Sequence, residues 1–336
     1  MKRAYAFRAK IEDVTVSVNT ISRRGSQHCS RPEQRSNHGS KSRVQVATIT
    51  PWLAFPWLLH GFSTRTGGFS VPYGGSSLNL GLTKEDRPKT VERNRELFLR
   101  SLGAAQGKAL LPLVTLRQIH SDLIHAVDAV PQEPLVGDGL VTDTPGLVLA
   151  VQTADCLPVI LIDAKRKAVG LFHAGWRGTV RRIVEKGVGE MRRYFGSDPK
   201  HLQAAIGPGI HKCCFEIGPE VRIQFEAQFA YADKLFREIK ELDPVREKYP
   251  MLFLTARAPG HSELPVQLFL DLVEANRQQL LDAGVAARNI HVSPLCTACR
   301  TDLLFSYRKE KGVTGRLNAS VEVLFASFTP LSSIPS

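Results

Sequence analysis

Residues 147–178 read LVLAVQTADCLPVILIDAKRKAVGLFHAGWRG, and this stretch decides the predicted fold. It contains three apolar runs, at 147–152, 158–163 and 168–173, with turn-forming residues between them. Short apolar runs between turns are typical of buried β-strands. The stretch therefore predicts the centre of a sheet, with polar side chains gathered at the strand ends.

Helical and strand-like patterns alternate on both sides of this stretch. We predict helices at 91–103, 178–196 and 268–284, and strands at 202–207 and 291–296. The first helix is expected to begin at the N-cap residue Thr90 and to end at Gly103.

Composition is typical of a globular protein. The chain has 336 residues, of which 43% are hydrophobic and 23% are charged, enough for a large core. No break in composition divides residues 46–330, so we expect one α/β (α+β) domain there. Within it, the charged, proline-containing residues 230–265 are expected to form a surface excursion.

The net charge of +12 is unevenly distributed. Residues 1–45 hold ten Lys or Arg against three Asp or Glu, are rich in Ser, and lack apolar periodicity. They are predicted to be a disordered basic tail, with a nucleic-acid arm or a transit peptide as the alternatives. The rest of the chain has only a mild positive excess, so we expect no nucleic-acid partner.

Targeting signals are not visible in the sequence. No apolar stretch approaches the length of a membrane span, and the N-terminus MKRAYAFRAK has no apolar signal region. Six cysteines are sparse for 336 residues and do not suggest a disulfide scaffold. We therefore expect a cytoplasmic protein in a reducing compartment.

Three potential metal ligands lie where strands are expected to end. These are His120, Cys156 and His173. Two imidazoles and one thiolate suit Zn²⁺ and leave one tetrahedral position open, as in catalytic zinc sites. Their spacing is not that of a zinc finger, and each residue alone is more often a structural His or a core Cys. Asp155, next to Cys156, is a candidate proton shuttle.

The segment GFSTRTGGFS (61–70) is a candidate anion-binding loop. Arg65 offers a planar set of donors for phosphate, and the amides of Gly67 and Gly68 are able to approach an anion closely. Arg177 is a second candidate cation. The alternative is a plain turn.

The remaining cysteines leave two interpretations open. The pair Cys213 and Cys214 and the CxxC pair Cys296 and Cys299 either pack structurally or form a four-thiolate site. The charged run 306–316 is expected to be a hairpin with glycines at its turn.

Seven motifs carry a family resemblance because they occur in a fixed order. They are STRTGG, QIH, DGLVT, TADCLP, HAGWRG, IGPGI–CCFEIG and CT–DLLFSYR–TGR. Together they closely resemble the laccase-domain family, once called multicopper polyphenol oxidases and related to a peptidoglycan editing factor. The similarity spans about residues 50–328. The long tail and the stretch 230–265 depart from the family pattern.

The resemblance implies a fold, a site and an activity. The fold would be a single-domain sandwich of mixed sheets flanked by helices, similar to cysteine-hydrolase deamidase toxins. The metal ligands would be His120, Cys156 and His173. The activities would be purine nucleoside phosphorylase, methylthioadenosine phosphorylase and adenosine deaminase, with zinc as cofactor and phosphate as co-substrate. The protein would be a monomer or a small homo-oligomer without a membrane partner.

A true multicopper oxidase is not expected. Its electron-transfer copper and separate copper cluster need many paired histidines, whereas this chain has ten His and three Met in total. Copper would occupy a His₂Cys site only adventitiously. Two other classes stay open: a cysteine hydrolase with Cys156 as nucleophile, acting on a peptidoglycan precursor, and a nucleic-acid-binding module that uses the basic tail.

Overall fold

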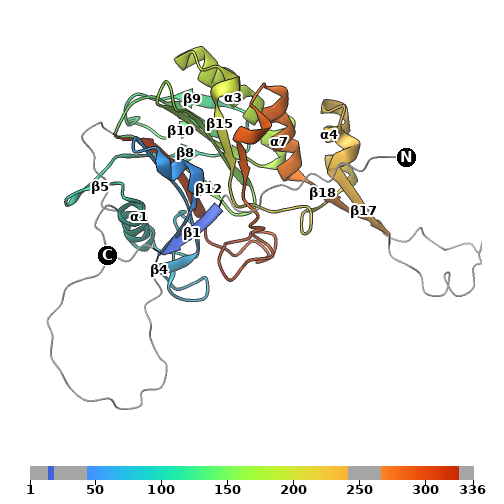
Figure 1. Cartoon of the computed structure of the whole chain (residues 1–336). Coiled ribbons are helices and arrows are strands. Elements are labelled where there is room, and N and C mark those ends of the chain that lie inside the picture. The colour runs from blue at the N-terminus through green and yellow to red at the C-terminus, as the bar shows by residue number, and fades with distance from the viewer. Residues whose placement is uncertain (1–13, 19–43, 241–265, 325–336) are drawn as a thin grey trace, which may run out of the picture.

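The computed structural model describes residues 14–18, 44–240 and 266–324, and two six-stranded sheets form its centre (Figure 1). The first sheet contains, in spatial order, β1 (Val14–Val18), β2 (Gln45–Ile49), β3 (Leu58–Ser63), β20 (Leu317–Val323), β12 (Val148–Thr153) and β7 (Leu113–Val114). The second sheet contains β19 (Ile290–Val292), β15 (Gln203–Ile206), β13 (Leu157–Asp163), β14 (Ala168–Ala174), β11 (Gly139–Thr142) and β9 (Ile124–Ala126).

Helices and short strands surround the two sheets. The helices are α1 (Pro88–Leu102), α2 (Trp176–Val180), α3 (Ile183–Phe195), α4 (Pro219–Gln228) and α7 (Leu272–Asp282). The further strands are β4 (Thr66–Ser70), β5 (Ala105–Gln106), β6 (Ala109–Leu110), β8 (Leu116–Arg117), β10 (Leu135–Val136), β16 (Glu216–Ile217), β17 (Phe236–Lys240) and β18 (Val266–Leu270). Short 3₁₀ helices are η1 (Thr50–Ala54), η2 (Pro199–His201), η3 (Ala232–Leu235) and η4 (Ala287–Asn289).

The three strands predicted within residues 147–178 are confirmed as β12, β13 and β14. β13 and β14 form an antiparallel pair in the second sheet, with Pro158 opposite His173 and Val159 opposite Phe172. β12 lies in the first sheet, where it pairs with β20 and β7. The short connection 154–156 therefore carries the chain from one sheet to the other.

The main core lies between the two sheets. Leu149 and Val151 of β12 pack in one buried cluster with Ile160 of β13 and Leu171 of β14. All four side chains are fully excluded from solvent. Burying an aliphatic side chain of this size contributes roughly 1.5–3 kcal/mol, so this interface is the main stabilising contact between the sheets.

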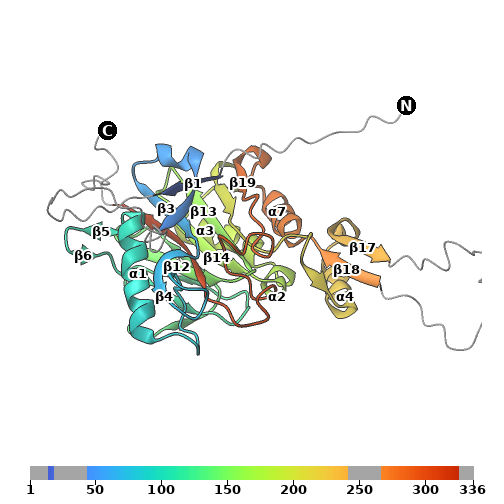
Figure 2. The same ribbon diagram turned by 90° about the horizontal axis from the view of Figure 1, so that it is seen from below.

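Helices cover the outer faces of both sheets, which confirms the predicted sandwich of mixed sheets flanked by helices. On the first sheet, Phe98 of α1 packs in a cluster with Leu59 and Val148. On the second sheet, α3 and α7 pack over Phe172 and its neighbours. Figure 2 shows α1 on one side of the sheets and α4 with β17 and β18 as a small unit at the other end. None of the helices in the described ranges is both long and apolar enough to cross a membrane.

Helix boundaries differ from the predictions for identifiable reasons. α1 begins at Pro88 with Arg87 as its N-cap, because proline at the first helical position already has the helical φ, so the predicted cap Thr90 is wrong. Its predicted end at Gly103 is confirmed, with φ of 98°. The helix predicted at 178–196 is two helices, since Arg182 is left-handed and interrupts it.

Three other segments also differ. Residues 268–270 of the third predicted helix belong to β18, and α7 starts only after its cap Asp271. The strand predicted at 291–296 is shorter, at Ile290–Val292. The run 306–316 forms successive turns and not a hairpin.

The two predicted irregular regions are only partly described. Within the predicted tail 1–45, residues 14–18 form a strand paired with β2, so the expectation of disorder is wrong for them. Within 230–265, residues 236–240 form β17 against β18. Residues 1–13, 19–43 and 241–265 lie outside the described residues.

One buried carboxylate in this fold makes stability depend on pH. Glu322 of β20 is fully buried on the α1 side of the first sheet, opposite Leu59, and neither carboxylate oxygen has a hydrogen-bond partner among the described residues. Burial raises the pKa of Glu322 to about 8. The unfolded chain therefore releases this proton first, and stability is lost as pH rises from about 4.5 towards 8.

We expect Glu322→Gln to remove this dependence. Between pH 5 and pH 8 the free energy of unfolding should fall by about 3 kcal/mol more in the wild type than in the variant. Urea unfolding at both pH values measures the difference. Glu133→Gln, at an exposed glutamate, is the control and should follow the wild type. Equal pH slopes for Glu322→Gln and the wild type would contradict the assignment.

Candidate metal centre

The structure brings the three predicted ligands together. One ligand atom from each of His120, Cys156 and His173 lies within 4.8 Å of the others. The Nε2 atom of His120 is 3.8 Å from the Sγ atom of Cys156, and the two imidazole rings are 4.9 Å apart. Cys156 lies immediately before β13 and His173 lies on β14, so the pairing of these strands places them side by side.

A buried aspartate orients both histidines. His173 donates from Nδ1 to Asp138 Oδ1 at 2.8 Å, which leaves its Nε2 free to face Cys156. The same carboxylate accepts hydrogen bonds from the backbone N–H groups of His120 at 3.0 Å and Ser121 at 2.6 Å. Asp138 is fully buried. A carboxylate that holds the far nitrogen of a ligating imidazole is a common feature of zinc sites.

The loop that presents His120 is held in an uncommon conformation. His120 has a φ of 57°, in the left-handed region that non-glycine residues rarely adopt. Its N–H is fixed by Asp138, and its carbonyl oxygen accepts from Arg181 at 3.2 Å. Hydrogen bonds on both sides of the residue therefore hold the imidazole at the site.

Charge separation follows from this arrangement. Burial alone would raise the pKa of the Cys156 thiol, but the nearby charge of His173 and a hydrogen bond with His120 lower it to about 6. Burial likewise opposes the charged form of His173, yet the Cys156 thiolate and Asp138 raise its pKa to about 9. Without a metal, the site therefore favours a thiolate next to an imidazolium.

Gly175 is a residue that the sequence analysis did not single out. A Cβ atom built on it would lie 2.8 Å from Cys156 Sγ and 3.0 Å from His120 Cδ2. Any side chain at this position would displace the ligands. Gly175 belongs to the motif HAGWRG and Asp138 to the motif DGLVT. Neither motif indicated that these two residues would lie against the candidate metal ligands.

Asp155, the predicted proton shuttle, holds a distant loop against the site. Its Oδ1 accepts from the hydroxyl groups of Thr297 at 2.6 Å and Ser306 at 2.7 Å. Its Oδ2 accepts from the backbone N–H of Arg308 at 2.6 Å. Both oxygens are thus engaged, and the role of proton shuttle stays a prediction.

The predicted anion loop makes mostly internal contacts. The Arg65 guanidinium donates to the carbonyl oxygens of Thr301 at 2.7 Å and Tyr73 at 2.8 Å and pairs with Glu310 at 2.9 Å. The N–H of Gly68 donates to Ser76 O at 2.9 Å, and an added Cβ there would lie 2.3 Å from Ser77 O. Gly67 has a positive φ of 87° that suits glycine.

Phosphate binding by Arg65, Gly67 and Gly68 therefore stays a prediction, at a loop whose donors also have structural partners. A cavity of about 490 Å³ lies beside this loop. Its lining includes Arg65, Ser76 and Lys309, and none of the three metal ligands borders it. Arg177 is placed differently, because its side chain is exposed in α2 and stacks on Trp176 at 4.4 Å.

The donor set fits a metal ion such as zinc. The ligands converge from three separate segments, the donors are two nitrogens and one sulfur, and Asp138 fixes the orientation of His173. Three protein ligands are the number that a catalytic zinc site uses.

The chain belongs to the family described as multi-copper polyphenol oxidoreductase laccase, which matches residues 59–323. This confirms the resemblance found in the sequence. A purine nucleoside phosphorylase from Deinococcus radiodurans is 36% identical over 272 residues, which cover 81% of this chain and 90% of that protein. Adenosine deaminase RL5 from an unknown prokaryotic organism is 36% identical over 219 residues, covering 62% and 74% of the two chains.

The same fold occurs in a solved relative. The crystal structure of the hypothetical protein YfiH from Bacillus licheniformis has a TM-score of 0.67 and 32% sequence identity to this chain. The match covers 85% of this chain and 97% of that structure.

Gly175→Ala tests whether close approach at this glycine sets the ligand geometry. The added methyl group must displace Cys156 or His120, so we expect zinc affinity to fall about 10- to 100-fold, as for other changes around a metal ligand. Competition with a chelating dye measures the affinity, and thermal melting reports whether the variant remains folded.

Gly189→Ala is the matched control. Its Cβ would meet no atom of the described part of the chain within 4 Å, and alanine is favoured over glycine inside a helix such as α3. Zinc affinity should stay unchanged. Unchanged affinity in Gly175→Ala as well would contradict the role of this contact.

Proposed function

We propose that this protein is a zinc-dependent purine nucleoside enzyme. It would phosphorolyse adenosine, inosine, guanosine and methylthioadenosine and deaminate adenosine to inosine. The observation that carries the proposal is the convergence of His120, Cys156 and His173 around a buried Asp138. The printed names of relatives, a purine nucleoside phosphorylase and an adenosine deaminase, support the choice of substrate.

The residues of the site would divide the work. His120, Cys156 and His173 would hold Zn²⁺, which when bound supplies a Lewis acid able to acidify water. Asp138 keeps His173 oriented by accepting a hydrogen bond from its Nδ1–H, so that only Nε2 would be presented to the metal. Copper would bind the same donors adventitiously.

Deamination replaces the C6 amino group of adenosine with oxygen from water and releases ammonia, so the leaving nitrogen must gain a proton. We retain Asp155 as the candidate proton shuttle, which would take a proton from the attacking water and pass it to the leaving nitrogen, because it precedes Cys156 in the chain and its carboxylate is buried at this wall of the site. To act, it would have to exchange a hydrogen bond with Thr297 or Ser306.

Phosphorolysis forms a bond between a phosphate oxygen and C1′ of ribose as the purine leaves. The phosphate needs a cation with donors to spare. Arg177 meets this need best, because its guanidinium is exposed and it lies two residues after Gly175, where an added Cβ would touch Cys156 and His120. Arg65 with Gly67 and Gly68 remains the second candidate, since its donors already bind carbonyl groups and Glu310.

Cys156→Ala tests the metal site and deamination together. Removing the thiolate should lower the zinc content by one ion per chain and reduce adenosine deamination by more than about 100-fold, beyond what an outer-shell change costs. Elemental analysis and chromatography of adenosine and inosine measure the two effects. His201→Ala serves as the control, because this histidine is exposed to solvent and is not one of the proposed ligands. Full retention of zinc and of deamination would refute the site.

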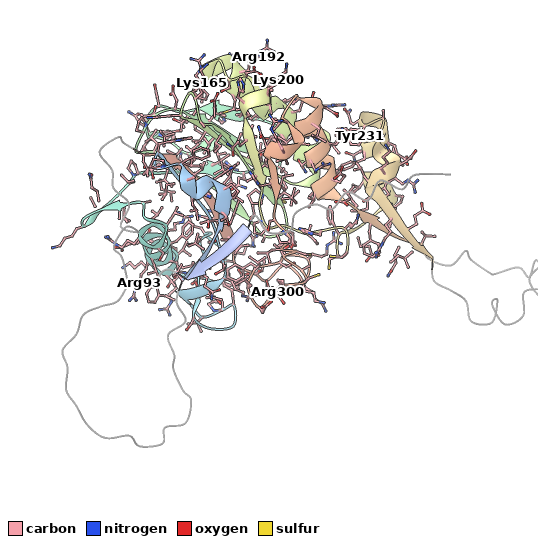
Figure 3. The ribbon with its side chains drawn as sticks, in the orientation of Figure 1. Arg93, Lys165, Arg192, Lys200, Tyr231 and Arg300 are labelled. Atoms are coloured by element: carbon pink, nitrogen blue, oxygen red, sulfur yellow. The ribbon has the colours of Figure 1, made fainter. Side chains whose placement is uncertain are left out.

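Arg177→Ala tests the phosphate site. We expect the KM for phosphate to rise about tenfold, the scale of one charge-assisted hydrogen bond, while deamination, which uses no phosphate, changes less than about twofold. Arg192→Ala is the control, because Arg192 is also exposed but lies on α3 at the outer side of the molecule (Figure 3). Equal loss of both activities would argue against a phosphate role.

A second candidate function is a cysteine hydrolase that acts on a peptidoglycan precursor. The observation that favours it is the position of the His173 ring between two groups. The ring faces the Cys156 thiolate on one side and donates to the Asp138 carboxylate on the other. This enzyme would need no metal. A metal-free sample that hydrolyses cell-wall precursors and is inactivated by a thiol alkylator would support it, whereas activity only with zinc would exclude it.

A further inference from the structure

Four cysteines outside the first site converge at one point. Cys213 and Cys214 come from the loop between β15 and β16, and Cys296 and Cys299 follow β19. The Sγ atoms of Cys213 and Cys296 are 3.7 Å apart, those of Cys213 and Cys299 are 3.5 Å apart, and those of Cys214 and Cys299 are 3.4 Å apart. All four sulfur atoms lie within 4.8 Å of one another.

These separations suit a common ion better than sulfur–sulfur bonds. A disulfide needs about 2.05 Å between its sulfur atoms, and the thiols here are free. In a tetrahedral zinc site with Zn–S bonds of about 2.3 Å, the sulfurs lie about 3.8 Å apart. The observed 3.4–3.7 Å is close to that value.

The backbone around Cys296 is arranged for a thiolate. The N–H of His211 points to its Sγ at 3.5 Å, and the N–H of Cys299 donates to the same sulfur. The N–H of Arg300 closes the turn on Cys296 O at 3.0 Å. Backbone donors directed at a sulfur stabilise its ionised form, which is the form that binds metals.

Without a cation the cluster opposes the ionisation of Cys213 and Cys214. Burial and a hydrogen bond with Cys299 raise the pKa of Cys214 to about 11, and burial also raises the pKa of Cys213. Thiolates crowded together repel one another, so a divalent cation at the centre would remove the conflict.

We propose that Cys213, Cys214, Cys296 and Cys299 bind a second zinc ion, which has a structural role and is separate from the His120–Cys156–His173 site. Four thiolates close the coordination sphere and leave no position for water or substrate, as structural zinc sites do. This proposal does not depend on the proposed enzymatic activity.

The second ion would join two loops that are distant in sequence. Cys213 and Cys296 are 83 residues apart in the chain. The two loops that carry them are already joined by a backbone hydrogen bond from Thr297 N–H to Gly209 O at 3.0 Å. The loop after Cys296 continues to Ser306 and Arg308, which bond Asp155 beside Cys156. The ion would thereby hold one wall of the first site in place.

The double substitution Cys213→Ser/Cys299→Ser tests the proposal. Both side chains are exposed, so the change leaves the core intact, and Arg300 in Figure 3 marks the loop that carries Cys299. The protein is purified under reducing conditions without added metal. We expect two zinc ions per chain in the wild type, one in Cys156→Ala, one in the double variant, and none when all three changes are combined.

Cobalt substitution distinguishes the two sites. Co²⁺ at a four-thiolate site should give strong sulfur-to-metal charge-transfer absorption. Cys156→Ala should keep most of it, whereas the double variant should retain only the weaker absorption that the single Cys156 thiolate gives. Cys29→Ser is the control, because it has no ligand role in the proposal. Two zinc ions in the double variant, no zinc in Cys156→Ala, or disulfides among these cysteines in reduced protein by mass spectrometry would each overturn the second site.

Discussion

The hydrogen bonds of Asp138 are the interaction on which the site depends. This one carboxylate is buried, ionised and shared between a ring nitrogen and the N–H groups of a loop. The hydrogen bonds from His173 and Ser121 overcome the effect of burial and lower its pKa to about 2. The sandwich buries Asp138, and the pairing of β11 with β14 places it next to His173. Its hydrogen bonds hold the loop of His120 in a left-handed conformation that the loop would not keep alone.

The sequence predicted the parts of the structure that depend on local patterns. β12, β13 and β14 were visible because each is an apolar run closed by turns, and the candidate ligands Cys156 and His173 were singled out because they lie between or at the end of these runs. Local patterns predicted an α/β (α+β) domain, whereas the sandwich of mixed sheets between helices was implied by the family resemblance that the seven ordered motifs carry. Zinc stays a prediction, which rests on the residue types and on the family resemblance, because two imidazoles and a thiolate also suit a cysteine hydrolase.

The rest depends on contacts between distant segments, which a sequence pattern does not reveal. Nothing local distinguishes Asp138 or Gly175 from an ordinary strand-end aspartate or turn glycine. Arg182 looks like a helix residue, yet it is left-handed and ends the continuity between α2 and α3. Arg65 looks like a free anion ligand, yet its donors are bonded to residues more than 200 positions away.

The placement of the ligands along the chain has a consequence for the order of folding. His120, Asp138, Cys156 and His173 all lie within residues 120–173, and β9, β11, β13 and β14 of this segment pair with one another. Loop closure within such a segment is entropically cheap. The wall formed by Ser306 and Arg308 arrives much later in synthesis. A nascent chain would therefore be able to bind the proposed zinc ion before it has the surface that substrates would meet.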